Sequence, residues 1–393
     1  MVFVRPFRGV RYDPRRVPMG RAVCPPYDVI PAVLAERLRR LPFNAIHLEL
    51  PSGNGNRYRK AAALWRRWRE RGVLQGDPAP SYYVVEQRFS HGGRSYVRTG
   101  ILGALDLRRS GPESVRRHEK TLSKPKADRL RLLSALRVNT SPIFGLFRDK
   151  GRGVRATLAK AKSGRPCAAG RSADGSRFLL WRVEAPRLLG SLERAFAAKS
   201  LLIADGHHRF EVAREYFRRN PKPEAAGLLI YLCAEEDAGL LVLPTHRVVA
   251  PPQEALRQVR ARCRLAPKPG LAALLKALDA HPSPYAFGVY APAAGFSLAV
   301  PRSRGGARSG LCVEWLAAHV TAHADPHHLK YTHEASEAVA LARRLEGAAL
   351  LVKPAGVRQI RRAVERIGLL PQKSTYFYPK VTTGLVFKPL GAV

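Results

Sequence analysis

Hydrophobic and polar positions follow two different periods along the chain, and these periods predict strands and helices in alternation. Continuous or alternating apolar runs predict strands or hairpins, chiefly at residues 82–89, 95–107, 143–147, 201–204, 227–234 and 284–300. Apolar positions three or four residues apart predict helices, chiefly at residues 58–71, 129–136, 208–219 and 356–368. The mixture predicts the α/β (α+β) class, with mixed sheets and flanking helices.

The same pattern predicts the structure of two short segments. Gly92 and Gly93 separate two predicted strands, which indicates a hairpin. In the segment NAIHLELP, at residues 44–51, apolar residues alternate with His47 and Glu49, which predicts a strand with one half-solvated polar face.

The length of 393 residues suggests two or three domains. We expect an N-terminal α/β region at residues 1–150, a central region at 151–250 and a C-terminal α/β region at 251–393.

The stretch LLIADGHHRFEVAREYFRR, at residues 201–219, combines a buried strand, a glycine turn and a helix. Asp205 and Gly206 end the apolar run, and the spacing of Phe210, Ala213 and Phe217 then gives the helix one apolar face. The turn between them carries one carboxylate, two imidazoles and one guanidinium.

This turn has the composition of an anion site. The first N–H groups of a helix have no partner within the helix, and the helix dipole places partial positive charge there. Gly206 permits positive φ and a close approach, while Arg209 offers a fork that suits phosphate oxygens. A plain Asp-Gly turn with solvated histidines is the alternative. Four polar residues directly behind a buried strand favour the phosphate site.

Composition limits the class of protein. Hydrophobic residues make up 46% of the chain and charged residues 25%, which is ordinary for a globular protein. No apolar run approaches the ~18 residues of a membrane helix, and the N-terminal segment lacks the apolar core of a signal peptide, so we expect no membrane partner and a cytoplasmic location. Five scattered cysteines predict buried, reduced thiols and argue against a disulfide framework or a thiolate zinc site.

The net charge of +38 suggests an acidic partner such as nucleic acid. The basic residues are spread over the whole chain, however, and form no Lys-rich tail or repeat with interleaved aromatic residues. A general preference for arginine on solvated surfaces explains the charge equally well. We expect non-specific nucleic-acid binding at low salt.

Three further segments carry polar clusters. The stretch 116–149 places His118, Glu119 and Lys126 before Asp128, which we expect to cap a helix at 129–136. A binding site and an ordinary charged surface are both open readings there. A second segment is the loop Lys-Ser-Thr at 373–375, whose residue types contact phosphate. The third, at 323–337, contains histidines and carboxylates that suggest a metal site, but it lacks HExxH; the carboxylates more simply begin a helix. Its histidines and carboxylates are His323, Asp325, His327, His328, His333, Glu334 and Glu337.

Several motifs occur in the order of a known family. The segments FRGVRYDP, PPYDVI, HEKT, KADR, NTSPIFGL, LLIADGHHRFEVA, LVLPTHRVV and PQKSTYFYPK resemble domain-of-unknown-function family 1015 over residues 3–388. The DGHHR element resembles that of free L-serine kinases, which are similar to ParB/sulfiredoxin-like nucleotide-binding folds. This chain has Phe210 where the motif more often has tyrosine, His333-Glu334 where His-Asp is common, and Leu369-Leu370 where a charged residue is typical.

The resemblance implies a function, and the requirements of phosphoryl transfer then suggest roles for residues. It implies a ParB/sulfiredoxin-like core around residues 190–250 and transfer of the terminal phosphoryl group of ATP or ADP to the hydroxyl of free L-serine. Asp205 would bind Mg²⁺ or orient the acceptor, and Glu119 would be the general base. The other expected catalytic residues are His208 and Arg209. Those expected to bind the nucleotide are Gly206, His207, Lys126, Arg129, Lys373, Ser374 and Thr375. Those expected to bind the acceptor are Asn139 and Ser141.

Two other functions are compatible with the same residues. A ParB-like module that binds nucleotide or nucleic acid without turning over a metabolite is the main alternative. A phosphatase or nuclease that uses the histidines is a third. The oligomeric state is not predicted.

Overall fold

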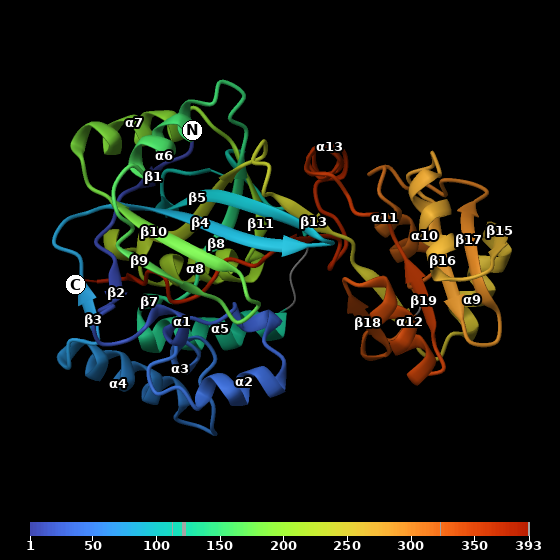
Figure 1. The fold of residues 1–393 in the computed structure, drawn as a ribbon, viewed down its shortest axis with the longest axis horizontal. Coiled ribbons are helices and arrows are strands. Elements are labelled where there is room, and N and C mark those ends of the chain that lie inside the picture. The colour runs from blue at the N-terminus through green and yellow to red at the C-terminus, as the bar shows by residue number, and fades with distance from the viewer. Residues whose placement is uncertain (112, 120–122, 323, 392–393) are drawn as a thin grey trace. The chain divides into compact units, whose positions relative to one another are not determined.

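The computed structural model describes residues 1–111, 113–119, 123–322 and 324–391 of a mixed α/β chain (Figure 1). The chain divides into two compact units. The first unit comprises Met1–Arg117, Thr121–Leu241 and Pro379–Val393, and the second comprises His118–Lys120 and Val242–Tyr378. The division into regions 1–150, 151–250 and 251–393 stays a prediction.

A mixed sheet forms the centre of the first unit. Its strands in spatial order are β6 (Val115–Arg116), β11 (Leu201–Asp205), β8 (Ile143–Phe147), β12 (Gly227–Ala234), β5 (Arg94–Asp106), β4 (Tyr82–His91), β10 (Arg177–Val183) and β9 (Ala168–Arg171), and β1 (Val4–Arg5) also pairs with β5. The pairs β6–β11 and β8–β12 are parallel, and the others are antiparallel. The hairpin predicted around Gly92 and Gly93 is confirmed as β4–β5, and both glycines have positive φ.

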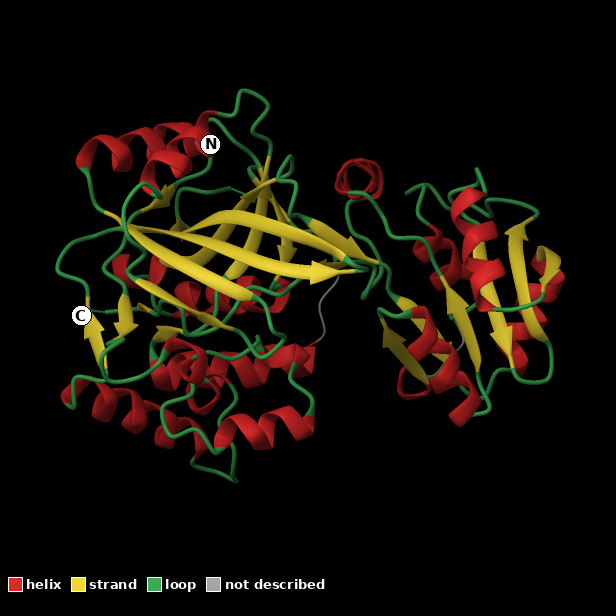
Figure 2. Cartoon of the chain, viewed as in Figure 1, coloured by secondary structure: helices red, strands yellow, loops and turns green. Residues whose placement is uncertain are grey.

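Helices cover both sides of this sheet (Figure 2). One side carries α6 (Gly153–Ala161) and α7 (Pro186–Ala197). The other side carries α1 (Met19–Ala22), α2 (Ala32–Arg39), α3 (Ile46–Glu49), α4 (Arg57–Glu70) and α5 (Ser123–Leu136). The helix α8 (His207–Arg219) packs against α5. Two short ladders complete the unit: β2 (Val10–Tyr12) with β3 (Leu74–Gly76), and β7 (Val138–Asn139) with β21 (Lys388–Pro389).

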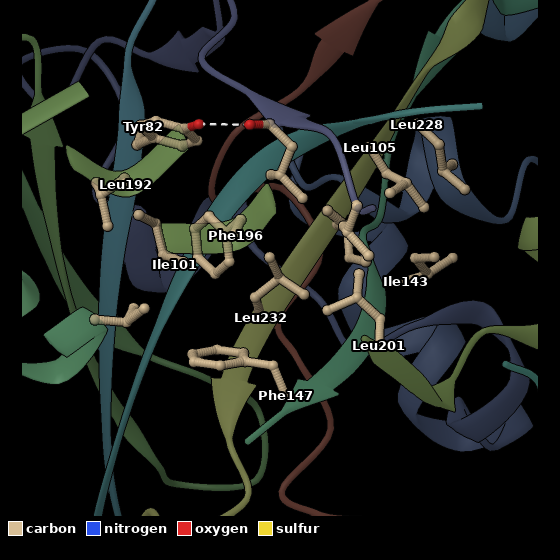
Figure 3. Packing of buried hydrophobic residues seen from close by; sticks show 14 of the residues in the cluster. Tyr82, Ile101, Leu105, Ile143, Phe147, Leu192, Phe196, Leu201, Leu228 and Leu232 are labelled. Atoms are coloured by element: carbon tan, nitrogen blue, oxygen red, sulfur yellow. Dashed lines mark hydrogen bonds between the residues drawn. The ribbon is translucent and has the colours of Figure 1, made fainter. Parts of the chain in front are cut away.

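A large apolar cluster holds the sheet and its helices together (Figure 3). Leu201 and Ile203, on one face of β11, join Leu192 and Phe196 from α7 in this cluster. At its edge the hydroxyl of Tyr82 donates to a main-chain carbonyl of β1 at 2.6 Å. Every apolar residue of β11 is buried, as predicted, and this packing fixes the position at which the strand ends.

The second unit is built on an antiparallel sheet. Its strands in spatial order are β15 (Cys263–Lys268), β17 (Gly295–Pro301), β16 (Phe287–Ala291), β19 (Ala348–Leu351), β14 (His246–Val249) and β18 (Leu329–Thr332). Its helices are α9 (Gln253–Arg262), α10 (Leu271–Ala280), α11 (Cys312–His319), α12 (Ala335–Arg344) and α13 (Val357–Ile367). Leucines of α10 and alanines of α12 pack on the sheet. The strands β13 (Leu241–Leu243) and β20 (Tyr376–Tyr378) pair with each other.

Two local predictions are wrong. The segment NAIHLELP forms the short helix α3 instead of a strand, and Glu49 is only 1% exposed. The cause is Asn44, whose side chain accepts from the N–H of Ile46 at 3.0 Å and so begins a helical turn. The predicted cap Asp128 lies inside α5, because this helix begins earlier than expected, at Ser123. A proline in the first helical turn removes no intrahelical hydrogen bond, so it does not prevent this earlier start.

Within the described parts of the chain, no helix has the length and hydropathy that crossing a bilayer requires.

Candidate functional site

The predicted strand–glycine–helix turn is present at the end of β11. Gly206 has φ +86° and is followed at once by α8. A Cβ at Gly206 would lie 2.9 Å from Cγ2 of Ile143 and 3.1 Å from its Cα. Glycine is therefore required twice, for its backbone conformation and for the space that it leaves.

The carboxylate of Asp205 is held between two cations. Its Oδ2 accepts from Nη2 of Arg209 at 2.8 Å, and its Oδ1 accepts from Nζ of Lys380. The side chains of Asp205, Lys380 and Arg209 are 15%, 11% and 11% exposed. Burial raises the pKa of Asp205, but the charges of Lys380 and Arg209 outweigh it and hold that pKa well below its usual range. Asp205 is thus ionised at neutral pH, and the side-chain cations of Lys380 and Arg209 lie beside it at the start of α8.

Arg209 also connects this turn to a small cavity in the first unit. Its Nη1 donates to the carbonyl of Pro142, and its guanidinium lines a cavity of about 50 Å³. The polar lining consists of Tyr27, Glu49, Arg129, Asn139, Thr140, Ser141 and Arg209. We call this the Glu49 cavity.

Glu49 is the buried carboxylate of this cavity. Its Oε1 accepts from Oγ of Ser141 at 2.9 Å and from the N–H of Tyr27 at 3.3 Å, while its Oε2 accepts from the hydroxyl of Thr140. Hydroxyl groups thus already approach this carboxylate, as the hydroxyl of a bound acceptor would. A carboxylate that accepts from a hydroxyl is placed to remove its proton.

Arg129 supplies a second guanidinium at the Glu49 cavity. It donates to the main-chain carbonyl of Glu49 at 2.6 Å and to Asp128 at 2.8 Å, and it lies 4.4 Å from the centre of the Tyr27 ring. Burial raises the pKa of Tyr27 to about 12, even with Arg209 and Arg129 opposing the rise. The cavity therefore offers two cationic groups and one carboxylate, a combination that suits a ligand with both signs of charge.

The other predicted residues of the first unit have varied surroundings. Asn139 accepts from the N–H of Leu229 at 3.0 Å, which ties its side chain to β12. Lys126 donates to Glu211 of α8 at 2.8 Å and so joins α5 to α8. His207 is buried, and His208 is half-buried at the start of α8.

The remaining predicted residues cluster in the second unit. The Oε1 of Glu119 accepts from the N–H groups of Ser374 and Thr375 at 3.0 and 3.1 Å. Thr375 also makes a hydrogen-bond contact of 2.8 Å with the ring of His118. Lys373 has φ +55°, in the left-handed region. Glu119 and the loop 373–375, which are separate features in the sequence, therefore contact each other directly.

Sequence reasoning missed two residues of the first unit. Lys380 is the final residue of the motif PQKSTYFYPK, in which Lys373 drew attention because it precedes a serine and a threonine. Glu49 was assigned to a solvated face, although a lone carboxylate in an apolar segment is itself a signal of a buried polar site.

A dedicated metal centre finds no support in the described ranges. They contain no group of three or more His, Cys, Asp or Glu side chains that would hold a metal ion. His323 lies outside the described residues, and Asp325 accepts from the N–H of His327 at 2.8 Å. Asp205 fits Mg²⁺ as a single carboxylate ligand, the arrangement found where substrate phosphates supply further ligands, although both of its oxygens contact cations.

Comparison with known proteins identifies a family and distant folds. The family model described as "Protein of unknown function (DUF1015)" matches residues 4–326. No curated protein matches the chain. A conserved hypothetical protein from Pyrococcus furiosus is similar with a TM-score of 0.40 and 13% identity, over 72% of this chain and 92% of that one. A free serine kinase in complex with AMP gives 0.39 and 11%, over 71% and 86%. SbnI from Staphylococcus aureus, truncated at its C-terminus, gives 0.41 and 9%, over 74% and 87%.

Proposed function

The chain belongs to the DUF1015 family of proteins of unknown function, and we propose that it is a small-molecule kinase. It transfers the terminal phosphoryl group of ATP or ADP to the hydroxyl of free L-serine and releases O-phosphoserine. One observation carries the proposal: Arg209 joins the ionised Asp205 and Lys380 at a helix N-terminus to the cavity that holds the buried Glu49.

The phosphate end of the proposed site is the turn at Asp205. Phosphoryl transfer requires positioning and neutralisation of charge rather than covalent help from the protein. Lys380 and Arg209 supply two positive charges, and the N–H groups that begin α8, at His207 and His208, point partial positive charge the same way. When a nucleotide binds, the two cations turn from Asp205 toward phosphate oxygens.

The acceptor end of the proposed site is the Glu49 cavity. Arg129 is placed to pair with the carboxylate of an amino acid, and Asn139 and Ser141 offer polar contacts. In the reaction the serine oxygen bonds to the terminal phosphorus, the bond from that phosphorus to the bridging oxygen breaks, and the hydroxyl proton passes to Glu49. Glu119, the base expected from the sequence, is the competing candidate from the second unit.

In the proposed reaction the only role of Mg²⁺ is to neutralise charge on the nucleotide phosphates. Bound by the nucleotide phosphates, Mg²⁺ supplies additional charge neutralisation. Asp205 is the residue that would hold it, because its carboxylate is ionised and released once Lys380 and Arg209 move to phosphate.

The charge of the chain supports a second candidate. A net charge of +38 favours a ParB-like module that binds nucleotide or nucleic acid without metabolite turnover. Sequence-specific DNA binding that persists at ~200 mM salt would support this module, since purely electrostatic binding weakens steeply with salt.

The test is direct production of O-phosphoserine. Purified chain with Mg²⁺, L-serine and either ATP or ADP should form it, and Asp205→Asn and Arg209→Gln should each lose at least about a hundredfold in rate. Arg218→Gln is the matched control, since Arg218 is an exposed arginine of the same helix, and its activity should equal that of the unmodified chain. Glu49→Gln and Glu119→Gln, compared side by side, identify the base. Absence of phosphorylated product with both nucleotides across a panel of small hydroxy acids and amino acids would refute the kinase.

A further inference from the structure

A second cavity in the first unit has a strongly basic lining. It measures about 320 Å³, a size that accommodates a small-molecule ligand. Its charged and apolar walls come from the end of α2, from α3 and the following loop, and from α4. We call it the basic cavity, and the lining residues that matter here are Arg39, His47, Arg57, Lys60, Leu64 and Arg67.

The helix α4 fixes most of this lining. Arg57, Lys60, Leu64 and Arg67 follow each other at spacings of three, four and three, so they share one face of the helix. The neighbouring face buries two tryptophans, and one of them, Trp65, packs against an aromatic ring of the core at 5.3 Å. Because this packing sets the rotation of α4, the cationic face is held toward the cavity.

The positive charge of the basic cavity is largely uncompensated. No carboxylate lines it, and within the described residues no carboxylate pairs with Arg39, Lys60 or Arg67. Arg39 donates to the carbonyl of Leu50 at 3.2 Å, which holds its guanidinium at the wall without neutralising it. Like charges gathered in a hollow repel each other, and a bound anion removes that repulsion.

We propose that the basic cavity binds a phosphorylated small molecule. Arg39 and Arg67 present forks that suit phosphate oxygens, and Lys60 adds a point charge to the same lining. Leu64 and the other apolar lining residues cover the uncharged part of the ligand. The site is separate from the turn at Asp205, so it does not depend on the proposed kinase activity.

Asp128 opposes this binding by occupying Arg57. Its Oδ1 accepts from Nη2 of Arg57 at 2.8 Å and from the hydroxyl of Tyr58 at 2.6 Å, and its Oδ2 accepts from Arg129, which lines the Glu49 cavity. An anion in the basic cavity competes with Asp128 for Arg57. Removing the charge of Asp128 therefore frees a fourth cation for the anion.

Titration calorimetry with inorganic pyrophosphate tests the proposal at about 0.15 M salt, where exposed charges more than about 8 Å apart are largely screened. The unmodified chain should show a binding event that Lys60→Gln/Arg67→Gln weakens at least about a hundredfold, since each of the two lost charge-assisted contacts contributes about 1.5 kcal/mol or more. Asp128→Asn should tighten the same event about threefold. Arg59→Gln, an exposed arginine of α4 that does not line the cavity, should leave it unchanged.

Two additional measurements distinguish the basic cavity from the turn at Asp205 and from a nucleic-acid site. Arg209→Gln should keep this binding event while losing the proposed kinase activity, so failure of one proposal is distinguishable from failure of the other. A DNA duplex of about 20 base pairs should not displace pyrophosphate; displacement would assign the site to nucleic-acid phosphates and overturn the small-molecule proposal. Equal affinity of the unmodified chain and the double variant, an equal loss with Arg59→Gln, or no binding by the unmodified chain would also overturn it.

Discussion

Replacing Asp205 by asparagine leaves Lys380 and Arg209 facing a neutral amide while all three side chains stay largely buried. Breaking a buried ion pair from one side costs about 3–5 kcal/mol, because a charge remains without compensation. Arg209 keeps its bond to the carbonyl of Pro142, so we expect the lower part of that range. The first unit of Asp205→Asn should therefore be destabilised by about 3 kcal/mol.

Urea unfolding followed by tryptophan fluorescence measures this effect. Three of the four tryptophans, Trp65, Trp68 and Trp181, belong to the first unit, so the signal reports mainly on it. With a slope of about 3 kcal/mol per M, the midpoint should fall by about 1 M urea. Glu215→Gln, which removes a half-exposed carboxylate that pairs with Arg218 and Arg219 on the same helix, should lower the midpoint by no more than about 0.3 M.

A double-mutant cycle gives the result that would refute this reasoning. Lys380→Met in the Asp205→Asn background removes one of the uncompensated cations, so the double variant should be more stable than the sum of the two single effects predicts, by about 1–2 kcal/mol. Strict additivity, or a midpoint shift for Asp205→Asn no larger than that of Glu215→Gln, would show that Asp205 and Lys380 do not stabilise each other.

Four other expectations follow from contacts and burial in the structure. The destabilisation caused by Asp205→Asn should shrink as pH falls below about 4, because the folded-state pKa of Asp205 is depressed. Its contribution to stability begins to decline when the unfolded carboxyl takes up a proton and is fully lost only below the folded-state pKa; urea titrations from pH 7 to pH 3 measure the decline. Glu49→Ala should cost about 3 kcal/mol in urea unfolding, because buried hydroxyls lose their acceptor, and Glu49→Gln should cost less. Gly206→Ala should cost about 2 kcal/mol from its positive φ and its clash with Ile143, measured the same way. A native thiol titration with a disulfide reagent should modify Cys167 first, since the other four cysteines are buried.

Local periodicity predicted much of the fold. The hairpin β4–β5 and the order β11, turn, α8 follow from patterns within about 25 residues, and both are present. The helix α3 escaped prediction because four residues complete barely one helical turn, too few to separate a helical period from an alternating one. Its start depends on a side chain, Asn44, rather than on hydrophobic pattern.

The candidate site was predicted where it is contiguous and missed where it is not. Asp205 to Arg209 form one turn, so their proximity is visible in the sequence. Lys380 meets Asp205 across 175 residues, and no local pattern specifies which of many lysines makes that contact. Glu49 was hidden for the same reason, because its partners Thr140 and Ser141 lie 91 and 92 residues away.

The order of the two units along the chain determines when the contact between Asp205 and Lys380 can form during protein synthesis. The first unit is left at Leu241 and resumed only at Pro379, after the whole of Val242–Tyr378 has been made. A ribosome therefore produces Asp205 and Arg209 long before Lys380, and a chain broken off between residues 242 and 378 carries the turn without that lysine and without the buried Phe387. The nascent first unit therefore lacks Lys380 and part of its hydrophobic core until the second unit has been synthesised. Completion of the proposed phosphate site is thus tied to completion of the intervening unit.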